Sequence, residues 1–352
     1  MRVILVGAYL GLLLLSWGIT EEGFEEALGD PHLLILLWGT GWFAGAHIGY
    51  RLSTQGSRGR RRAYALTALL TLTALTLLRE APSLRLAGYL IETTAVAVGL
   101  SLLVGTASRG THNYTVKEAI ARGLVASGVT SLVGGAILTL AWINGVSAAA
   151  WLAFTVSVVA LLLAVGERDS LVPPAFLDAL DELSSALAGM RVPRAGSLTL
   201  VAMLAVASSY SRLWTRYACN CGSPMLYALG GLAFSLGAVL AFRSGQDKAG
   251  ALTVVILAIL GLVRGEPCGG YLALSLITGY YSGYGYAIAH ARNPMRLAAY
   301  SLRVSTGLVL AVVAAVLLAG AGFLHLLGLA LVLIGELGVF TVTLLRPGRR
   351  AY

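Results

Sequence analysis

The sequence predicts an all-α integral membrane protein with 12 transmembrane helices in two pseudo-symmetric six-helix halves (6+6). Composition is the first reason: 57% of the 352 residues are hydrophobic and 12% are charged, with a mean hydropathy of +0.81. Such values exclude an ordinary soluble domain. The second reason is pattern, because twelve apolar stretches fall into two sets of six around one polar segment near the middle of the chain.

Most of these stretches have the length of a membrane-crossing helix. A helix rises 1.5 Å per residue, so about 17 to 25 apolar residues cross the roughly 30 Å of hydrocarbon. The third and ninth stretches are shorter, and local thinning of the bilayer accommodates such helices. The predicted helices occupy residues 3–19, 33–50, 63–78, 86–106, 120–143, 146–165, 197–217, 225–242, 249–263, 269–289, 296–319 and 323–345.

The polar segment, residues 166–195, is predicted to be a cytoplasmic linker. It divides the chain into an N-terminal half, residues 1–165, and a C-terminal half, residues 196–352. Leucines recur at helical spacing after the pair Pro173-Pro174, which is a suitable helix start. We therefore expect an amphipathic helix on the cytoplasmic face of the membrane.

The basic residues predict the orientation of the chain. Its formal net charge is +9, with 25 Lys and Arg. If the N-terminus is cytoplasmic, only five of these residues fall on the outside: Arg79, Arg85, Arg212, Arg216 and Arg264. This positive-inside bias places both termini and the linker in the cytoplasm of a multi-pass cell-membrane protein. The other basic residues are scattered over short loops, so we expect membrane lipid and no nucleic acid as a partner.

Two loops pair arginine with glycine where the chain leaves one helix and enters the next. The loop after the second stretch, GYRLSTQGSRGRRRAYAL, carries Arg51 and Gly56. The loop after the eighth stretch, AVLAFRSGQDKAGAL, carries Arg243 and Gly245. An arginine beside a helix end can pair with a carboxylate or with helix carbonyls and so hold one conformation.

Six plus six helices, cytoplasmic termini and these two loops resemble the major facilitator superfamily. The corresponding loop of that family reads close to G-x-L-x-D-R-x-G-R-R. This sequence lacks the aspartate, having Ser53 or Thr54 in the first copy and Phe242 in the second. The resemblance implies secondary transport by alternating access, with Arg51, Gly56, Arg243 and Gly245 in gating roles. For Arg60, Arg61 and Arg62, orientation of the chain and contact with lipid headgroups is an equally good interpretation.

Glu92 is the main candidate for proton coupling, and it falls within the fourth predicted helix on one face with Tyr89. A carboxyl group inside the membrane is costly unless it is paired, protonated or facing water. Burial favours its neutral form, which suits a group that binds and releases a proton. The alternative is a structural acid bonded to a hydroxyl or an arginine of a neighbouring helix.

Two sets of polar residues are candidates for substrate binding, together with Tyr89. On the seventh predicted helix, Ser209, Arg212 and Arg216 share one face and offer donors to an anionic group. The alternative is that the two arginines reach the outer membrane interface. The tenth predicted helix offers a hydroxyl-rich face and nearby tyrosines, which are Tyr271, Ser275, Thr278 and Tyr281.

All three cysteines are predicted to lie outside. Cys219 and Cys221 are too close in sequence to bridge each other without strain, so one of them is expected to pair with Cys268. Three unpaired thiols are the alternative. We expect no metal and no cofactor.

No sequence motif of an enzyme was found: G-x-x-x-x-G-K-[ST], HExxH and GxSxG are all missing. The sequence therefore predicts a non-enzymatic, monomeric secondary transporter for a small solute. Transport is expected to be coupled to protons through Glu92, with an anionic substrate if Arg212 and Arg216 face the cavity. The alternative is a non-transporting membrane subunit that docks a partner protein.

Overall fold

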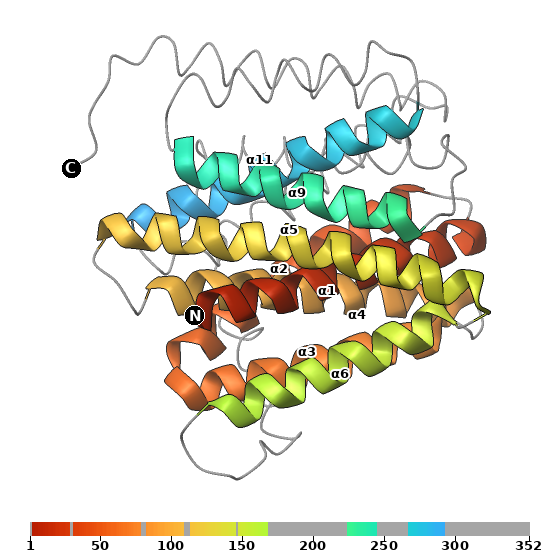
Figure 1. Cartoon of the computed structure of the whole chain (residues 1–352), viewed down its shortest axis with the longest axis horizontal. Coiled ribbons are helices and arrows are strands. Elements are labelled where there is room, and N and C mark those ends of the chain that lie inside the picture. Colours follow the sequence, from red (N-terminus) through yellow and green to blue (C-terminus); the bar gives the residue numbers. More distant parts are fainter. Residues whose placement is uncertain are drawn as a thin grey trace.

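The computed structural model describes residues 2–28, 31–78, 82–108, 113–145, 147–167, 224–244 and 267–292 (Figure 1). These residues form α1 (Arg2–Leu28), α2 (Pro31–Thr54), α3 (Gly56–Leu77), α4 (Pro82–Ser108), α5 (Asn113–Ile143), α6 (Ala148–Gly166), α9 (Pro224–Ser244) and α11 (Pro267–Arg292). They match eight of the twelve predicted stretches. The linker beyond Glu167 and the other four stretches lie outside the described residues.

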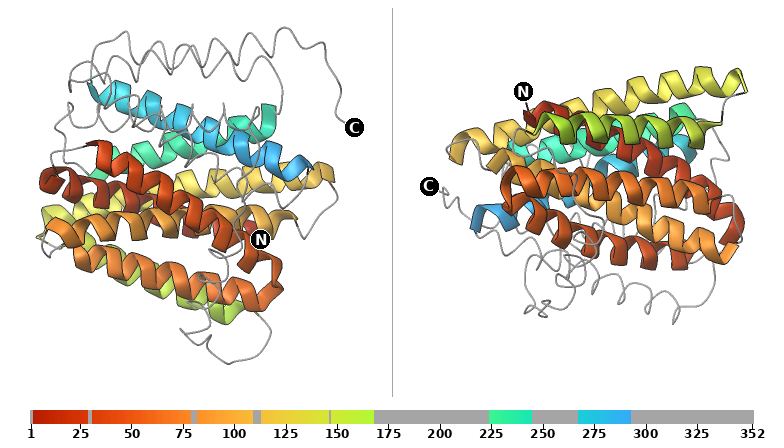
Figure 2. Two further views of the ribbon diagram at one scale, coloured as in Figure 1. Left: turned by 180° about the vertical axis from the view of Figure 1, so that it is seen from behind. Right: turned by 90° about the horizontal axis from the view of Figure 1, so that it is seen from below.

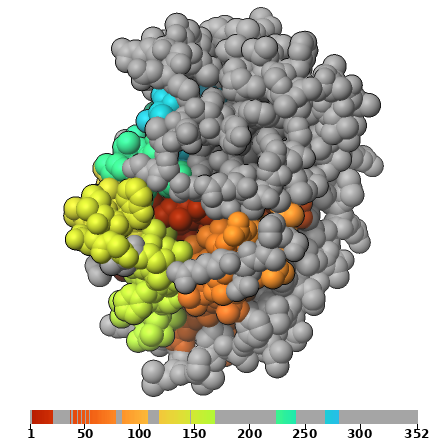
Figure 3. Space-filling view, turned by 90° about the vertical axis from the view of Figure 1, so that its right-hand side faces the viewer, coloured from red at the N-terminus to blue at the C-terminus, as the bar shows by residue number. Residues whose placement is uncertain are grey.

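The described chain is a helical membrane protein. Five of its helices, α1, α4, α5, α6 and α9, contain a segment long and apolar enough to cross a bilayer. Large apolar side chains are exposed along α5 and α6, which lie at the surface in Figure 3. Examples are Val133, Phe154 and Leu161, which are 52%, 71% and 64% exposed. Such a face is stable against lipid and costly against water.

Several helices begin where the sequence supplies a start signal. Proline is the first residue of α2, α4, α9 and α11, a position where its missing N–H costs no hydrogen bond. At α6 the cap is Ser147, whose hydroxyl accepts a hydrogen bond of 3.5 Å from the N–H of Ala150.

Two segments predicted as loops are largely helical. The acidic segment after the first stretch continues α1 as far as Leu28, because glutamate, alanine and leucine favour helix once the chain has left the apolar stretch. The basic segment after α2 forms the first turns of α3. The chain reverses at Gln55 and Gly56, and Gly56 has φ of 78°, a left-handed conformation that suits glycine.

The helices lie side by side in one bundle (Figure 2). α1 contacts α4 and α5 of the predicted N-terminal half and α9 of the predicted C-terminal half. α3 and α6 pack against each other at one edge, and α9 and α11 pack together on the far side of α5 (Figure 1). α1 and α5 therefore both contact the two groups, and the contact between α5 and α9 is the more extensive link.

A stripe of glycines allows α2 to lie directly against α4. Gly41, Gly45 and Gly49 recur every four residues, so they share one face of α2. A Cβ atom on each would collide with a backbone carbonyl of α4, those of Leu90, Thr94 and Val98 in turn. Small residues at this spacing are a common device for close helix packing in membranes.

Candidate functional site

The two predicted halves meet closely along α5 and α9. The hydroxyl of Ser235 donates a hydrogen bond of 3.3 Å to the hydroxyl of Ser127. One turn further along, the hydroxyl of Ser131 donates to the backbone oxygen of Ala228 at 3.3 Å. Gly135 is so near Ala228 that a Cβ atom there would overlap it. We call these residues the α5–α9 seam.

A small cavity with aromatic walls lies beside this seam, between α1, α9 and α11. The ring of Phe234 packs edge-on against Trp17 and Trp42, with centroids 6.4 Å apart in both pairs. The cavity has room for about one water molecule. The described residues that line it are all uncharged: Leu14, Trp17, Gly18, Tyr227, Gly230, Gly231, Phe234 and Tyr271.

Only one of the predicted substrate residues of α11 lines this cavity. Tyr271 does so, with its phenol against Gly230. Ser275 and Thr278 are buried, and each hydroxyl donates a hydrogen bond of 2.8 Å to a carbonyl of its own helix. The side chain of Tyr281 lies outside the described residues.

Glu92 is fully buried, with an exposed fraction of 0%. The hydroxyls of Ser16 on α1 and Thr71 on α3 face its carboxyl group. In the described part of the chain, the two hydroxyls lie within hydrogen-bonding reach of the carboxyl group, although none of the four oxygen atoms makes a hydrogen bond of standard geometry. Nearby, the phenol of Tyr9 and the hydroxyl of Thr67 form a hydrogen bond of 2.8 Å. Three helices thus surround one buried carboxyl group.

Tyr89, predicted to bind substrate, is fully buried on α4 one turn from Glu92. Its residue number places it on the same face of the helix. It is not among the residues that line the aromatic cavity. Glu92, Ser16 and Thr71 do not line it either, so the carboxyl group and the cavity are separate features.

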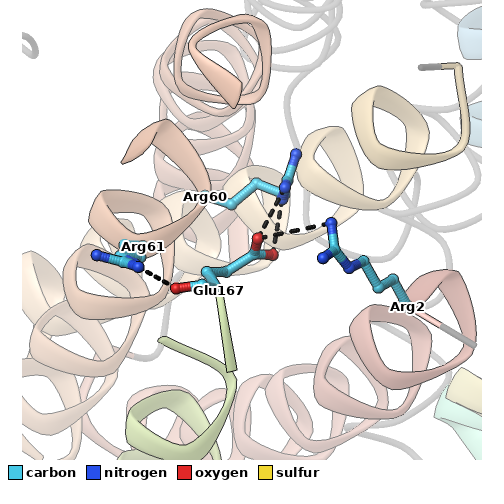
Figure 4. Close-up of polar contacts among 4 residues, drawn as sticks. All are labelled: Arg2, Arg60, Arg61 and Glu167. Carbon is cyan, nitrogen blue, oxygen red and sulfur yellow. Dashed lines mark hydrogen bonds and ion pairs between the residues drawn. The ribbon is translucent and has the colours of Figure 1, made fainter. Parts of the chain in front are cut away.

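A charged cluster lies at the end of the bundle where α3 begins and α6 ends (Figure 4). Arg60 donates two hydrogen bonds of 2.7 Å, one to each carboxylate oxygen of Glu167. Arg61 donates to the backbone oxygen of Glu167, and Arg2 lies 3.9 Å from its carboxylate. Both paired side chains are nearly buried, 10% exposed for Arg60 and 7% for Glu167. The cluster shows that α1 and α3 begin, and α6 ends, at the same end of the bundle.

The sequence did not single out Glu167. It lies 107 residues from Arg60 along the chain. One sequence signal could have identified Glu167. It directly follows an apolar stretch, and it lies on the same predicted side of the membrane as a run of arginines.

The predicted gating residues are only partly described. Arg51 is exposed in the last turn of α2, and Gly56 forms the turn described above. Arg243 belongs to α9, but its side chain lies outside the described residues, as does Gly245. The structure leaves the gating roles as predictions.

The remaining predicted residues lie outside the described ranges, namely Ser209, Arg212, Arg216, Cys219 and Cys221. Cys268, near the start of α11, is disulfide-bonded, and its partner is not among the described residues. The choice between Cys219 and Cys221 stays a prediction. Within the described ranges, no group of three His, Cys, Asp or Glu side chains is placed to hold a metal ion.

Solved transporter structures share this fold. The chain matches the xylose transporter XylE from E. coli in a partially occluded inward-open conformation, with a TM-score of 0.60 and 14% identity over 100% of this chain and 98% of that one. It also matches the human organic anion transporter MFSD10, with a TM-score of 0.53 and 16% identity over 97% of both chains. A D-xylose-proton symporter matches with a TM-score of 0.50 and 15% identity over 88% and 87%.

No protein-family model and no curated protein matches the sequence. At these identities the structural matches show the fold alone. They support a fold of the major-facilitator type, as the sequence predicted, over the full length of the chain.

Proposed function

We propose that the chain is a secondary transporter that moves a small solute across a membrane by alternating access. The observation that carries this proposal is the small aromatic cavity between α1 of the predicted N-terminal half and α9 and α11 of the predicted C-terminal half. Transporters built from two repeats hold their substrate at this junction, near the middle of the bilayer. Matches that span the whole chain, to a xylose transporter and an organic anion transporter, support the same interpretation.

The α5–α9 seam supports a state closed to one side. On α5 the seam contacts begin at the middle of the helix and continue toward the C-terminal end, as far as Gly135. On α9 they begin at the middle of the helix and continue toward the N-terminal end, as far as Ala228. In the predicted topology both of these ends are outside. We infer that the seam is an outer gate, closed here, and that separating the halves along it opens the cavity to the outside. Arg51, Gly56, Arg243 and Gly245 stay our proposed residues for the inner gate.

The substrate class has two candidates. The described lining of the cavity is uncharged and aromatic. In this state the cavity holds only about one water molecule, so a solute enters it only when the helices separate. The lining then favours a neutral solute with an apolar or ring-shaped face. The predicted arginines Arg212 and Arg216 favour an anionic solute. A panel that contains both classes separates these candidates.

Glu92 is our proposed coupling group. Glu92 is fully buried on α4, and a carboxyl group inside the membrane is costly unless it is paired, protonated or facing water. A group that binds a proton in one state and releases it in the other couples the proton gradient to solute movement.

Uptake into proteoliposomes tests the proposal. Wild type and Glu92→Gln are compared against a panel of neutral sugars, neutral aromatic solutes and small organic anions, with internal pH recorded by a trapped dye. We expect one class to enter, with a pH change that the variant loses. Uptake that survives in the variant without any change in its pH response removes Glu92 from the mechanism. A chain that moves no member of either class, while remaining folded, would favour the partner-docking alternative.

A further inference from the structure

The charged cluster where α1 and α3 begin holds more positive charge than its carboxylate balances. Arg2, Arg60 and Arg61 bring three positive charges and Glu167 brings one negative charge, which leaves the cluster with a net charge of +2. Both α1 and α3 begin here, and the N-terminal end of a helix adds a partial positive charge. The excess of positive charge favours an anion as its complement.

The carboxylate satisfies the three arginines to different degrees. Arg60 is nearly buried and donates two hydrogen bonds to Glu167, so its role is structural. Arg2 is 61% exposed, and at 3.9 Å it lies too far from that carboxylate for a hydrogen bond. Arg61 is partly exposed, and in the described part of the chain its Nε–H has no hydrogen-bond acceptor. Arg2 and Arg61, which approach Glu167 from opposite sides (Figure 4), therefore keep donors for a further acceptor.

An apolar face lies directly next to this cluster. The last turns of α6 expose Leu161, Leu162 and Val165, with exposed fractions of 64%, 65% and 69%. Glu167 comes two residues after Val165, so the charged cluster and the apolar face adjoin each other. A soluble anion gains nothing from such a face, whereas an acyl chain is stable against it. Charged donors beside an apolar helix face match the two parts of a phospholipid.

We propose that the cluster and the last turns of α6 form a binding site for an anionic phospholipid. Its phosphate accepts hydrogen bonds from Arg2 and Arg61, since guanidinium groups suit the geometry of phosphate oxygens. An acyl chain lies along Leu162 and Val165. A headgroup of the phosphatidylglycerol class balances the positive charge, whereas phosphatidylcholine brings a positive charge of its own.

This site differs from the general attraction of basic loops to anionic membranes. Its donors come from α1 and α3 and its apolar face from α6, so it exists only in the folded bundle. Lipid bound there holds the starts of α1 and α3 against the end of α6. The proposal does not depend on solute transport.

Thermal unfolding of the full-length protein in nanodiscs tests the site. Discs of phosphatidylcholine alone are compared with discs that also contain phosphatidylglycerol, at constant pH and ionic strength. A ligand that binds only the folded state raises the melting temperature, and we expect phosphatidylglycerol to raise Tm by about 2–4 °C in wild type. Native mass spectrometry of protein extracted from the mixed discs is expected to show retained phosphatidylglycerol.

Three variants keep the test specific to the cluster. Arg2→Gln and Arg61→Gln each remove one positive charge and leave the pair of Arg60 and Glu167 in place. Each is expected to lose at least half of the Tm response and to retain less phosphatidylglycerol. Arg122→Gln is the matched control, because Arg122 has a similar exposed fraction of 65% but pairs with Glu118 on its own helix. It is expected to keep the wild-type response.

Glycerol 1-phosphate separates a lipid headgroup from free phosphate, because it carries a phosphate without acyl chains. It is added to the discs of phosphatidylcholine alone, and we expect it to leave Tm unchanged.

Three results overturn the lipid site. The first is a wild-type Tm that is the same in both kinds of disc. The second is a phosphatidylglycerol response that survives unchanged in both Arg2→Gln and Arg61→Gln. The third is a full Tm response to glycerol 1-phosphate, which identifies a site for soluble phosphate instead. None of these measurements involves solute uptake, so a failure of this inference and a failure of the proposed function are distinguishable.

Discussion

Arg60 and Glu167 form a two-point ion pair between the start of α3 and the residue that follows α6, with both hydrogen bonds at 2.7 Å. The pair is bidentate, which is the strongest geometry for an arginine and a carboxylate. Since α3 and α6 both belong to the predicted N-terminal half, the pair fixes the internal geometry of that half. It also fixes the point where the predicted linker begins.

We predict that removing one partner of this pair destabilises the protein. Glu167→Gln leaves Arg60 nearly buried without its carboxylate, and the expected loss is about 2–4 kcal/mol in the free energy of unfolding. Chemical denaturation in detergent micelles, followed by far-UV circular dichroism, measures this loss. Glu118→Gln is the control, because Glu118 pairs with Arg122 on an exposed surface, where removal is expected to cost less than about 0.5 kcal/mol. Equal effects of the two variants would show that burial does not matter at Glu167.

The glycine stripe of α2 gives a second prediction. In Gly45→Ala the new methyl group collides with the carbonyl of Thr94 and lies 2.7 Å from the Cβ atom of Ala97. We expect a loss of about 1–3 kcal/mol in unfolding free energy. Gly166→Ala, at an end of α6 where a Cβ atom meets no other atom within 4 Å, is expected to be neutral. Thermal melts of both variants decide this, and a wild-type Tm for Gly45→Ala would contradict the close packing of α2 and α4.

Phe234 gives a third prediction, because its ring joins Trp17 and Trp42 at the cavity. Phe234→Ala is expected to lower the free energy of unfolding by about 3–5 kcal/mol. Tryptophan emission is expected to shift to longer wavelength as water enters the cavity. Phe154→Ala removes the same ring from a lipid-facing position that is 71% exposed, and is expected to change neither quantity. Emission that is unchanged in Phe234→Ala would place the two tryptophans away from this ring.

The membrane-spanning cores were the predictable part of the fold. The predicted stretch 86–106 lies within α4, Pro82–Ser108, and the stretch 225–242 lies within α9, Pro224–Ser244. About twenty apolar residues have few stable alternatives to a transmembrane helix, so composition alone predicts the element. The ends were less predictable, because hydropathy carries no information once a helix leaves the membrane. The extension of α1 to Leu28 and the short α2–α3 turn were missed for this reason.

The contacts between helices were the unpredictable part. Glu92 was identified from its position in an apolar stretch, but its partners Ser16 and Thr71 come from two other helices. Glu167 was missed because its role is to pair with Arg60, which is remote from it in sequence. The aromatic cavity was predicted only at Tyr271, since Trp17 and Phe234 are ordinary apolar residues until the bundle brings them together.

The most direct measurement is solute uptake by a variant that carries Ser127→Cys and Ser235→Cys. The native hydroxyls are 3.3 Å apart across the α5–α9 seam, so the introduced thiols are placed to form a disulfide on oxidation. Uptake of the solute identified by the panel is compared in oxidised and reduced proteoliposomes, with each single variant as a control. Alternating access predicts that oxidation stops uptake in the double variant alone and that reduction restores it. Full uptake with the cross-link in place, verified by mass spectrometry, would contradict a transport cycle in which the halves separate at this seam.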